Sequence, residues 1–237
     1  KRVAATLPGS PFSLPIVELT PNPVPKVVVV DKPDRTQVQT RIGTPIVNGL
    51  HDDADPIWLG AVAFGGIFTS PFTREVRDIR GWSYFASASF QRRQRNTAPM
   101  ILSAATSIDD VVDCLELQFE LYEQLVRDGI GKEDLEHTRS YLLKRYPFNF
   151  TTAESLLGPS LRNELLGISE NELFEFPSKL SRFEVELVCS ALQANFPSKP
   201  SVAVLVGPAD NLMPRLEKRF PQFELEAVPF KQGLGAE

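Results

Sequence analysis

Histidine and cysteine are both scarce in this sequence, with two residues of each among 237. A catalytic zinc site takes about three protein ligands, and Cys114 and Cys189 have no metal-type spacing. Both cysteines fall in segments with helical patterning, so we interpret them as small buried side chains rather than as a disulfide or a ligand pair. Neither His51 nor His137 stands in a setting typical of a serine or cysteine nucleophile. The chain alone therefore carries no recognisable catalytic centre.

The sequence also lacks an excess of positive charge and any long apolar run. Its formal net charge is -5 and its pI is about 5.3, whereas proteins that track nucleic-acid phosphates usually carry a basic excess. No apolar run approaches the ~20 residues of a bilayer-spanning helix, and the N-terminus has none of the zones of a signal peptide. We expect a soluble protein that neither binds nucleic acid nor spans a membrane. Its start at Lys1 rather than methionine indicates processing or a longer parent chain.

Proline is concentrated at the start of the chain, where residues 1–25 hold six of the 20 prolines and show no sustained period. Proline fixes its own φ and pushes the preceding residue toward extended shapes, so this segment is typical of an extended linker. We place one folded domain over residues 26–237.

Hydrophobic periodicity predicts a mixture of strands and helices after that linker. Asp55 before Pro56 and Ser70 before Pro71 are typical helix starts, and Gly81 is typical of the position just past a helix end. Strands are expected at 27–30, 38–42, 82–90, 98–106, 201–206 and 223–228, and helices from 55 onward and at 71–80, 108–127, 132–145, 152–166, 182–196 and 211–220. Because strands and helices do not alternate strictly, the pattern favours an α+β fold with helices layered on a sheet.

The most distinctive stretch is REVRDIRGWSY, residues 74–84, in which three arginines recur at intervals of three. On a helix that turns by about 100° per residue, Phe72, Val76 and Ile79 share one stripe that should pack on the sheet. The arginines form a drifting row beside this stripe, with Arg74 nearly opposite the core.

After Gly81 the chain is expected to turn into a strand in which Trp82, Tyr84, Ala86 and Ala88 share a side. Such a return would bring the tyrosine near the last turns of the helix. An arginine fork and a phenolic hydroxyl aimed at one point are the donors that a polarised peptide carbonyl, or its oxyanion, needs. The plainer interpretation is exposed arginines and a half-buried tyrosine, and the spacing alone favours it.

Three blocks, taken together, carry a family resemblance. They are PDRTQVQTRIG at 33–43, FGGIFTSPFTREVRDIRGWSY at 64–84 and VAVLVGPADNLMPRLEKRF at 202–220. In this order, over about residues 26–230, the sequence resembles the C-terminal, non-catalytic domain of the M16 (pitrilysin-like) zinc metallopeptidases. The central block follows the family pattern G-G-x-x-x-S-x-x-x-x-x-x-R-x-x-x-G-x-x-Y, and the matching residues are Gly65, Gly66, Ser70, Arg77, Gly81 and Tyr84. Trp82 and Ser83 stand where a leucine and an alanine are common.

The resemblance implies a LuxS/MPP-like α+β fold, which is a mixed six-stranded sheet with helices mainly on one face. It implies that Arg77 and Tyr84 bind the peptide substrate and polarise its carbonyl in trans, across from a zinc that an HxxEH motif holds. That motif is expected in an M16 N-terminal domain or catalytic subunit that pairs with this chain. Because this chain has no HxxEH, we expect it to bind no cofactor and to be inactive alone. A homo-oligomer stays open, and as a compartment we favour the bacterial periplasm slightly over the cytoplasm.

A proteolytically silent structural or assembly subunit with the same fold is the rival interpretation, although a pure scaffold has no physical need for the arginine and tyrosine. His51 begins the acidic loop HDDAD and His137 lies on a helix without a second histidine, so both are expected at the surface. QRRQR, residues 91–95, could grip acidic substrate, and GPAD, residues 207–210, could start an anion-binding helix. We favour a solvated hairpin tip for the first and an ordinary strand-to-helix turn for the second.

Overall fold

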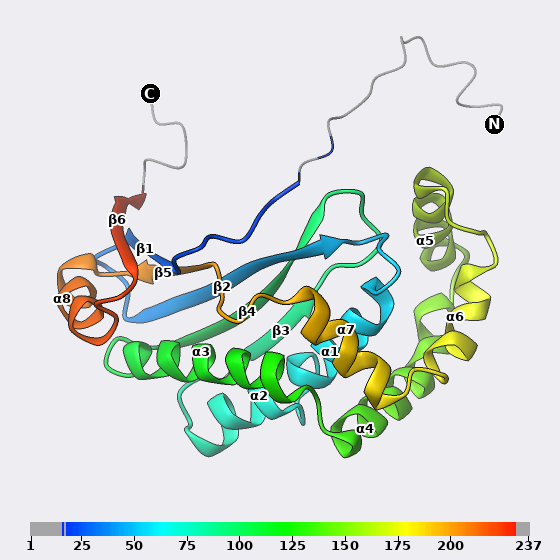
Figure 1. Ribbon diagram of the computed structural model, residues 1–237, viewed down its shortest axis with the longest axis horizontal. Helices are drawn as coiled ribbons and strands as arrows, with labels where there is room; N and C mark the ends of the chain where they lie inside the picture. The colour runs from blue at the N-terminus through cyan, green and yellow to red at the C-terminus, as the bar shows by residue number, and fades with distance from the viewer. Residues whose placement is uncertain (1–15, 17, 231–237) are drawn as a thin grey trace, which may run out of the picture.

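The computed structural model describes residues 16 and 18–230, and it centres on one mixed sheet of six strands. The strands are β1 Lys26–Asp31, β2 Gln37–Asn48, β3 Ala86–Phe90, β4 Thr97–Ser107, β5 Val202–Gly207 and β6 Glu224–Pro229. They follow the order β3-β4-β2-β5-β1-β6 across the sheet (Figure 1). β1 pairs in parallel with β5 and β6, and the remaining pairs are antiparallel.

Alternation of buried and covered side chains explains why these segments form strands. In β1, Val27 and Val29 are fully buried while Val28 and Val30 are only partly covered. Val38, Thr40 and Ile42 of β2 point into the same core. A strand places successive side chains on opposite faces, so this period of two buries one face of the sheet.

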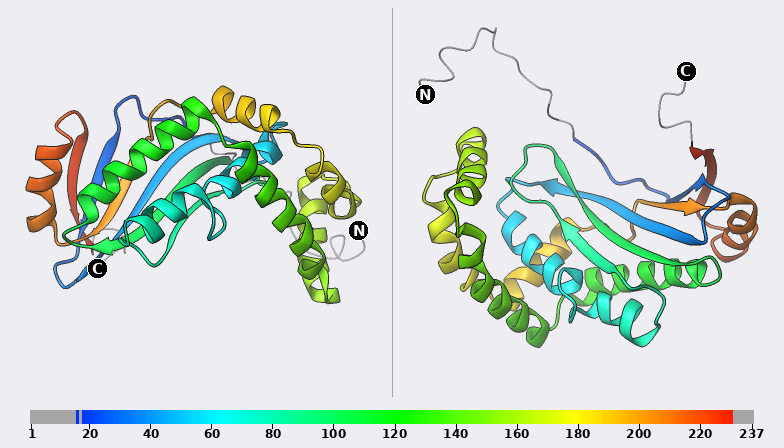
Figure 2. Two further views of the ribbon diagram at one scale, coloured as in Figure 1. Left: turned by 90° about the horizontal axis from the view of Figure 1, so that it is seen from below. Right: turned by 180° about the vertical axis from the view of Figure 1, so that it is seen from behind.

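The helices cover mainly that face. They are α1 Ala54–Gly65, α2 Pro71–Thr73, α3 Val111–Asp128, α4 Lys132–Arg145, α5 Ala153–Leu166, α6 Glu172–Leu180, α7 Val185–Asn195 and α8 Ala209–Arg219, with a π-helix η2 at Arg74–Ile79 and a 3-10 helix η3 at Tyr146–Phe150. α1 and α3 lie against the sheet, and α7 packs on these two helices. α4, α5 and α6 extend beyond one end of the sheet (Figures 1 and 2). α8 packs beside β1 and β6 at the other end. The predicted α+β fold, with its mixed six-stranded sheet and helices mainly on one face, is confirmed.

α6 has no counterpart among the elements expected from the sequence. Pro177 stands inside it, and a proline normally ends a helix because it leaves an earlier carbonyl without its N–H partner. Here that carbonyl belongs to Leu173, and it accepts a hydrogen bond from the Tyr146 hydroxyl at 2.7 Å instead. Leu173, Phe176 and Leu180 are buried at spacings of three and four, which is the signal that marks this helix.

β3 begins at Ala86, so the prediction of a strand from residue 82 is wrong. The Ser83 hydroxyl donates to the Phe85 carbonyl at 2.6 Å and accepts the Ala105 N–H at 3.1 Å. Such side-chain bonds satisfy the backbone in place of a sheet ladder. Tyr84 therefore stands on a connector ahead of the strand, and does not share a strand face with Ala86.

The arginine hairpin, residues 91–95, is not the solvated tip that we expected. Arg92 lies over the rings of Trp58 and Phe176, and its guanidinium is 2.5 Å from the Asp55 carboxylate. Arg93 has a φ of 63°, a conformation that a non-glycine residue rarely adopts, and it pairs with Glu172 at 3.2 Å. Arg95 donates to a carbonyl at the end of α5. The hairpin thus ties β3 and β4 to α1, α5 and α6.

The turn at residues 207–210 is closed from within the fold. A carboxylate oxygen of Asp31, at the end of β1, accepts the Ala209 N–H at 2.9 Å. The first free amide of α8 is therefore already used, and the acid favours the positive end of the helix. This arrangement agrees with the interpretation as a strand-to-helix turn.

Both cysteines are free. Cys114 is buried in α3, and burial raises the pKa of its thiol to about 12, so it stays protonated and unreactive at neutral pH. Cys189 of α7 is half-buried, and its sulfur accepts the Ile130 N–H at 3.4 Å. A Cβ on Gly129, whose φ is +76°, would lie 2.4 Å from that sulfur, so only glycine fits there.

Residues 1–15 and 17 of the predicted linker lie outside the described residues. Residues 18–24 have neither helix nor strand and are exposed, and β1 begins at Lys26. We expect limited proteolysis to remove residues 1–25 first and to leave a core that begins near Lys26, because residues 18–24 are exposed and lie outside any helix or strand. Mass spectrometry of a time course checks this, and a first cut inside the sheet or the helices would refute the proposed boundary.

Within residues 16 and 18–230, no helix combines the length and the apolar character needed to cross a bilayer.

Candidate functional site

The helix that carries the arginines starts at Ser70 and Pro71 as predicted, but it does not remain an α-helix. After one turn of α2 the backbone widens into η2, Arg74–Ile79. The Arg80 N–H donates to the Glu75 carbonyl, five residues back, at 3.1 Å. Such π-turns are rare and are frequent at functional sites.

The π-turn also corrects the predicted apolar stripe. Phe72 and Val76 are fully buried as expected, but the Ile79 side chain is 59% exposed. Each turn of a π-helix holds more residues than a turn of an α-helix, so a position three residues after Val76 no longer lies above it. Gly81, with a φ of +66°, then lets the chain turn sharply away.

Arg77 and Tyr84 lie side by side at this turn. The guanidinium carbon of Arg77 is 5.6 Å from the centre of the Tyr84 ring and 4.8 Å from the centre of the Phe68 ring. The Tyr84 side chain is 84% exposed, and the nearest acid to Arg77 is Asp78, at 3.6 Å. Cation–π contacts fix the guanidinium while leaving its N–H groups available. The structure thus brings together two donors that stand seven residues apart on either side of Gly81.

The other two arginines of the stretch are placed differently. Arg80 stacks on Trp82, with 5.3 Å between the guanidinium carbon and the ring centre. Arg74 is exposed, and no ion pair involves it among the residues that the structure describes. Only the middle arginine is oriented by two aromatic rings at once.

The segment from Gly65 to Ser70, here called the glycine loop, supports this arrangement. A Cβ on Gly65 would lie 2.6 Å from the Cβ of Ala88, and a Cβ on Gly66 would lie 2.6 Å from the Cα of Val62. Neither position has room for a side chain, because Gly65 packs against strand β3 and Gly66 packs against the preceding turn of helix α1. The Ser70 hydroxyl donates to the Val62 carbonyl at 3.1 Å and accepts an N–H of the loop at 3.2 Å. The matched glycines and serine thus fix the shape of this loop.

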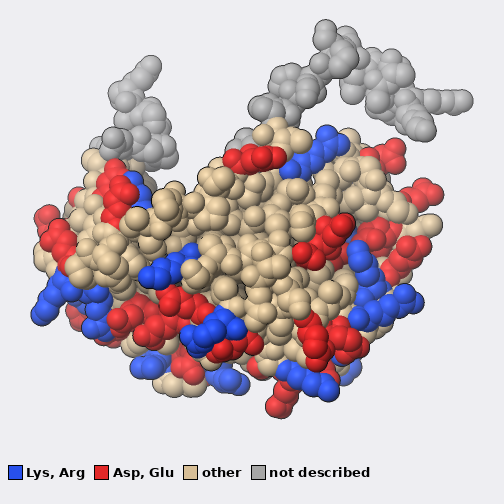
Figure 3. All heavy atoms as spheres, viewed as in Figure 1, with Lys and Arg blue, Asp and Glu red and all other residues tan. Residues whose placement is uncertain are grey.

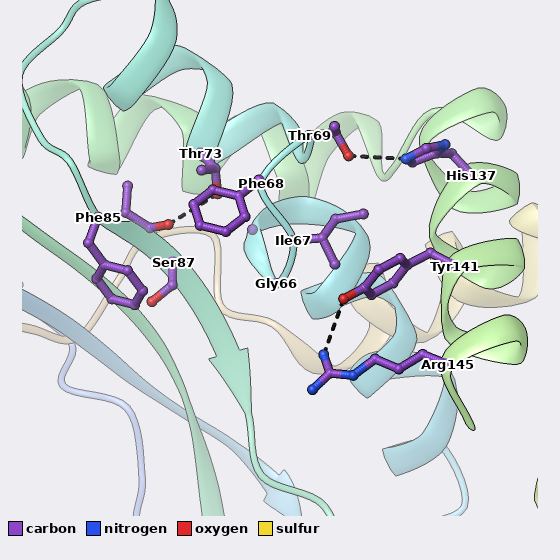
Figure 4. Close-up of a pocket in the computed structure, with 12 residues that line it drawn as sticks. Gly66, Ile67, Phe68, Thr69, Thr73, Phe85, Ser87, His137, Tyr141 and Arg145 are labelled. Atoms are coloured by element: carbon purple, nitrogen blue, oxygen red, sulfur yellow. Dashed lines mark hydrogen bonds between the residues drawn. The ribbon is translucent and has the colours of Figure 1, made fainter. Parts of the chain in front are cut away.

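A pocket of about 330 Å³ opens between the glycine loop, β3 and α4 (Figure 4). Phe68 and Phe85 form one side, and His137, Tyr141 and Arg145 of α4 form the other. Of these five side chains, only His137 was considered from the sequence pattern. The spacing of four residues between the α4 side chains places them on one helix face, and this was the available signal.

Both histidines are exposed, as expected, and they lie on different elements. The Nδ1 atom of His51 accepts the Asp53 N–H at 3.1 Å within an exposed turn. The Nε2 atom of His137 lies 3.1 Å from the Thr69 hydroxyl, which links α4 to the glycine loop. Among the described residues, no group of three or more His, Cys, Asp and Glu side chains is placed to hold a metal ion.

Charges are mixed rather than segregated on the face of the molecule shown in Figure 3. On the face shown in Figure 3, basic and acidic side chains alternate over the helices. Several of them are paired at the surface, such as Arg219 with Asp113 and Glu116. This face therefore does not form the continuous basic field that nucleic acid requires.

Comparison with known proteins identifies the relatives of this chain. Residues 2–142 match the family described as the peptidase M16 inactive domain. No curated protein matches the chain in sequence. The family match contains the glycine loop, Arg77 and Tyr84.

Several solved structures share the fold. A peptidase M16 inactive domain from Pseudomonas fluorescens superimposes with a TM-score of 0.77 at 19% identity, over 87% of this chain and 48% of that chain. A protease from Helicobacter pylori gives a TM-score of 0.70 at 14% identity, over 85% and 49%. The periplasmic protease PqqL from Escherichia coli gives 0.63 at 14% identity, over 79% and 20%. The present chain therefore spans about half the length of the first two relatives and about a fifth of the length of the third.

Proposed function

This chain belongs to the M16 peptidase family as an inactive domain, and from this membership we propose that it is the non-catalytic half of a zinc metallopeptidase. The peptide is held partly by Arg77 and Tyr84 and is cut at a zinc site in an HxxEH-bearing domain or subunit. The observation that carries the proposal is the Arg77 guanidinium, oriented between the Phe68 and Tyr84 rings with the Tyr84 ring exposed. Residues 26–237 form the domain in this proposal, and residues 1–25 are its linker.

The two side chains act as donors to the carbonyl of the bond that is cut. The Arg77 fork and the Tyr84 hydroxyl donate to its oxygen, which becomes negative as the carbonyl carbon turns tetrahedral. Fixed donors need little reorganisation when that charge forms, and the stacking of Arg77 on two rings supplies this fixation. The zinc of the partner would supply Lewis-acid chemistry and an activated water.

Within the part of the chain that the structure describes, the residues do not fit a zinc ion. A catalytic zinc takes about three protein ligands, and the two histidines sit on separate elements with Asp53 and Thr69 as their neighbours. Zinc is therefore assigned to the partner. The similarity to a periplasmic protease supports the bacterial periplasm as the compartment.

One observation favours the alternative of a silent assembly subunit. Leu157, Leu161 and Leu165 recur every four residues along α5, and all three are more than half exposed. An apolar helix stripe of this kind is typical of a contact with another protein. It does not account for the orientation of Arg77.

We expect the purified chain to hold no stoichiometric zinc and to cleave no peptide, and to become part of an active peptidase when combined with its HxxEH half. Elemental analysis and a peptide-cleavage assay, on the chain alone and on the mixture, measure both. One zinc per chain that is lost on changing His51 or His137 to alanine would overturn the proposal. So would a mixture no more active than the HxxEH half alone.

A further inference from the structure

Apart from Phe68, the residues that line the pocket between the glycine loop, β3 and α4 take no part in the donor arrangement, yet the pocket is well formed. Its volume of about 330 Å³ is at the lower end of ligand pockets, which span roughly 300–1,000 Å³, so it suits one large side chain better than a cofactor. Phe68 and Phe85 at its mouth are 61% and 58% exposed. Large rings left open to solvent on both sides of a pocket indicate that something apolar covers them.

The pocket is continuous with the proposed donor site. Phe68, which lines it, is the same ring on which the Arg77 guanidinium stacks at 4.8 Å. Phe85, on the same side, directly follows Tyr84 in the chain. A peptide that passes the two donors would therefore place a neighbouring side chain at this mouth.

The pocket lining carries basic but no acidic side chains among the described residues. Its lining contains no aspartate or glutamate among the described residues, while Arg145 and His137 of α4 contribute nitrogen atoms. The Arg145 guanidinium donates to the Tyr141 hydroxyl at 3.2 Å and stays at the rim (Figure 4). A lysine or arginine side chain would meet this cation without a compensating acid.

A peptide does not bind here by pairing with the backbone of β3. Although β3 is at the edge of the sheet, its Ala86 carbonyl already accepts the Thr73 hydroxyl at 3.1 Å. Gly65 also packs against the Ala88 backbone, so close that a Cβ there would lie 2.7 Å from the Ala88 nitrogen. With this edge covered, an extra strand cannot pair there, and a peptide is held by its side chain.

We infer that this pocket takes one large apolar side chain, preferably aromatic, of the peptide whose carbonyl lies at Arg77 and Tyr84. The inference rests on the proposed function and adds a preference to it. Ring-against-ring contacts with Phe68 and Phe85 select for size, and the Arg145 rim selects against basic side chains.

The test measures side-chain preference in the reconstituted complex. Starting from a peptide that it cleaves, Phe, Leu, Ala and Lys are placed in turn at each position flanking the cut bond, and kcat/KM is measured. We expect one position to favour Phe over Ala by about 10-fold or more, with Lys lowest, a range typical of apolar pockets. Ser87→Phe fills the pocket from β3, and Tyr141→Ala removes part of its α4 wall.

Both variants should bring the Phe-to-Ala ratio close to one, and Phe174→Ala, an exposed aromatic on α6, should leave it unchanged. Because Tyr141 is 40% exposed, Tyr141→Ala should fold normally even if Ser87→Phe perturbs β3. A ratio that stays high in both variants, or no preference at any position, overturns the inference. Failure of the donor proposal appears separately, as a Tyr84→Phe complex that keeps its full kcat.

Discussion

Tyr84→Phe should lower kcat of the reconstituted peptidase about 100-fold to 1,000-fold, which is the usual cost of losing one oxyanion donor. The change removes only the hydroxyl and keeps the ring that stacks at 5.6 Å from the Arg77 guanidinium carbon. Because Tyr84 is 84% exposed, the change should leave the stability of the fold unaltered. Steady-state cleavage and thermal unfolding of the complex measure the two effects independently.

Arg77→Lys should also be harmful, since an ammonium group cannot reproduce the planar fork or its stacking between Phe68 and Tyr84. Arg74→Ala, on the exposed side of the same irregular helix, is the matched control and should be nearly silent. Zinc content should be normal in all three variants, because none of the changed residues is assigned to the metal. If Tyr84→Phe and Arg77→Lys retain full activity, or lose it only in step with lost folding, the scaffold interpretation replaces the donor role.

The sequence predicts the fold well where burial has a simple period. The valines of β1 and the alternation in β2 mark strands, and the family resemblance orders them into a six-stranded mixed sheet. The prediction from hydrophobic periodicity fails between residues 71 and 85. It assumes an α-helix with 3.6 residues per turn, whereas the backbone at Arg74–Ile79 forms a π-turn. The proximity of Arg77 and Tyr84 was expected from a helix returning into a strand, yet the structure achieves it through η2, Gly81 and a connector.

Long-range partners are the other part that the sequence alone cannot supply. A hairpin with three arginines is usually solvated, and nothing local distinguishes this one. Its acids stand 37 and 79 residues away, on α1 and on the helix α6 that was not predicted. The pocket has the same origin, since its walls come from the glycine loop, β3 and α4, which only the folded chain brings together.

The largest effect on stability is expected from the ion pair beneath this hairpin. The side chains of Arg92 and Asp55 are each only 13% exposed, and the guanidinium carbon lies 4.3 Å from the Trp58 ring centre and 3.8 Å from that of Phe176. Removing Arg92 leaves the buried Asp55 carboxylate with Lys179 as its remaining counter-charge, so Arg92→Ala should lower the free energy of unfolding by up to about 3–5 kcal/mol. Lys179, whose Nζ is 2.5 Å from the other carboxylate oxygen, keeps the loss from being larger.

The pH dependence of stability tests whether the charge of Asp55, rather than packing, is what this ion pair contributes. Burial alone would raise the pKa of Asp55, but the charge of Arg92 and hydrogen bonds from Lys179 and Arg92 outweigh it and hold that pKa below its ordinary value of 3.8. A carboxyl with a lowered folded pKa stabilises the protein above its unfolded pKa, and this contribution is lost as pH falls through the folded pKa.

Denaturant unfolding at pH 7 and again near the folded pKa should therefore show a smaller difference between wild type and Asp55→Asn at the lower pH. Arg95→Ala, in the same hairpin but exposed and hydrogen-bonded to a carbonyl of α5, should cost about 1 kcal/mol or less at both pH values. Equal losses for Arg92→Ala and Arg95→Ala would mean that the hairpin is held by its strands alone. An Asp55→Asn difference that does not change with pH would show that packing over Trp58 and Phe176, rather than charge, is what Arg92 contributes.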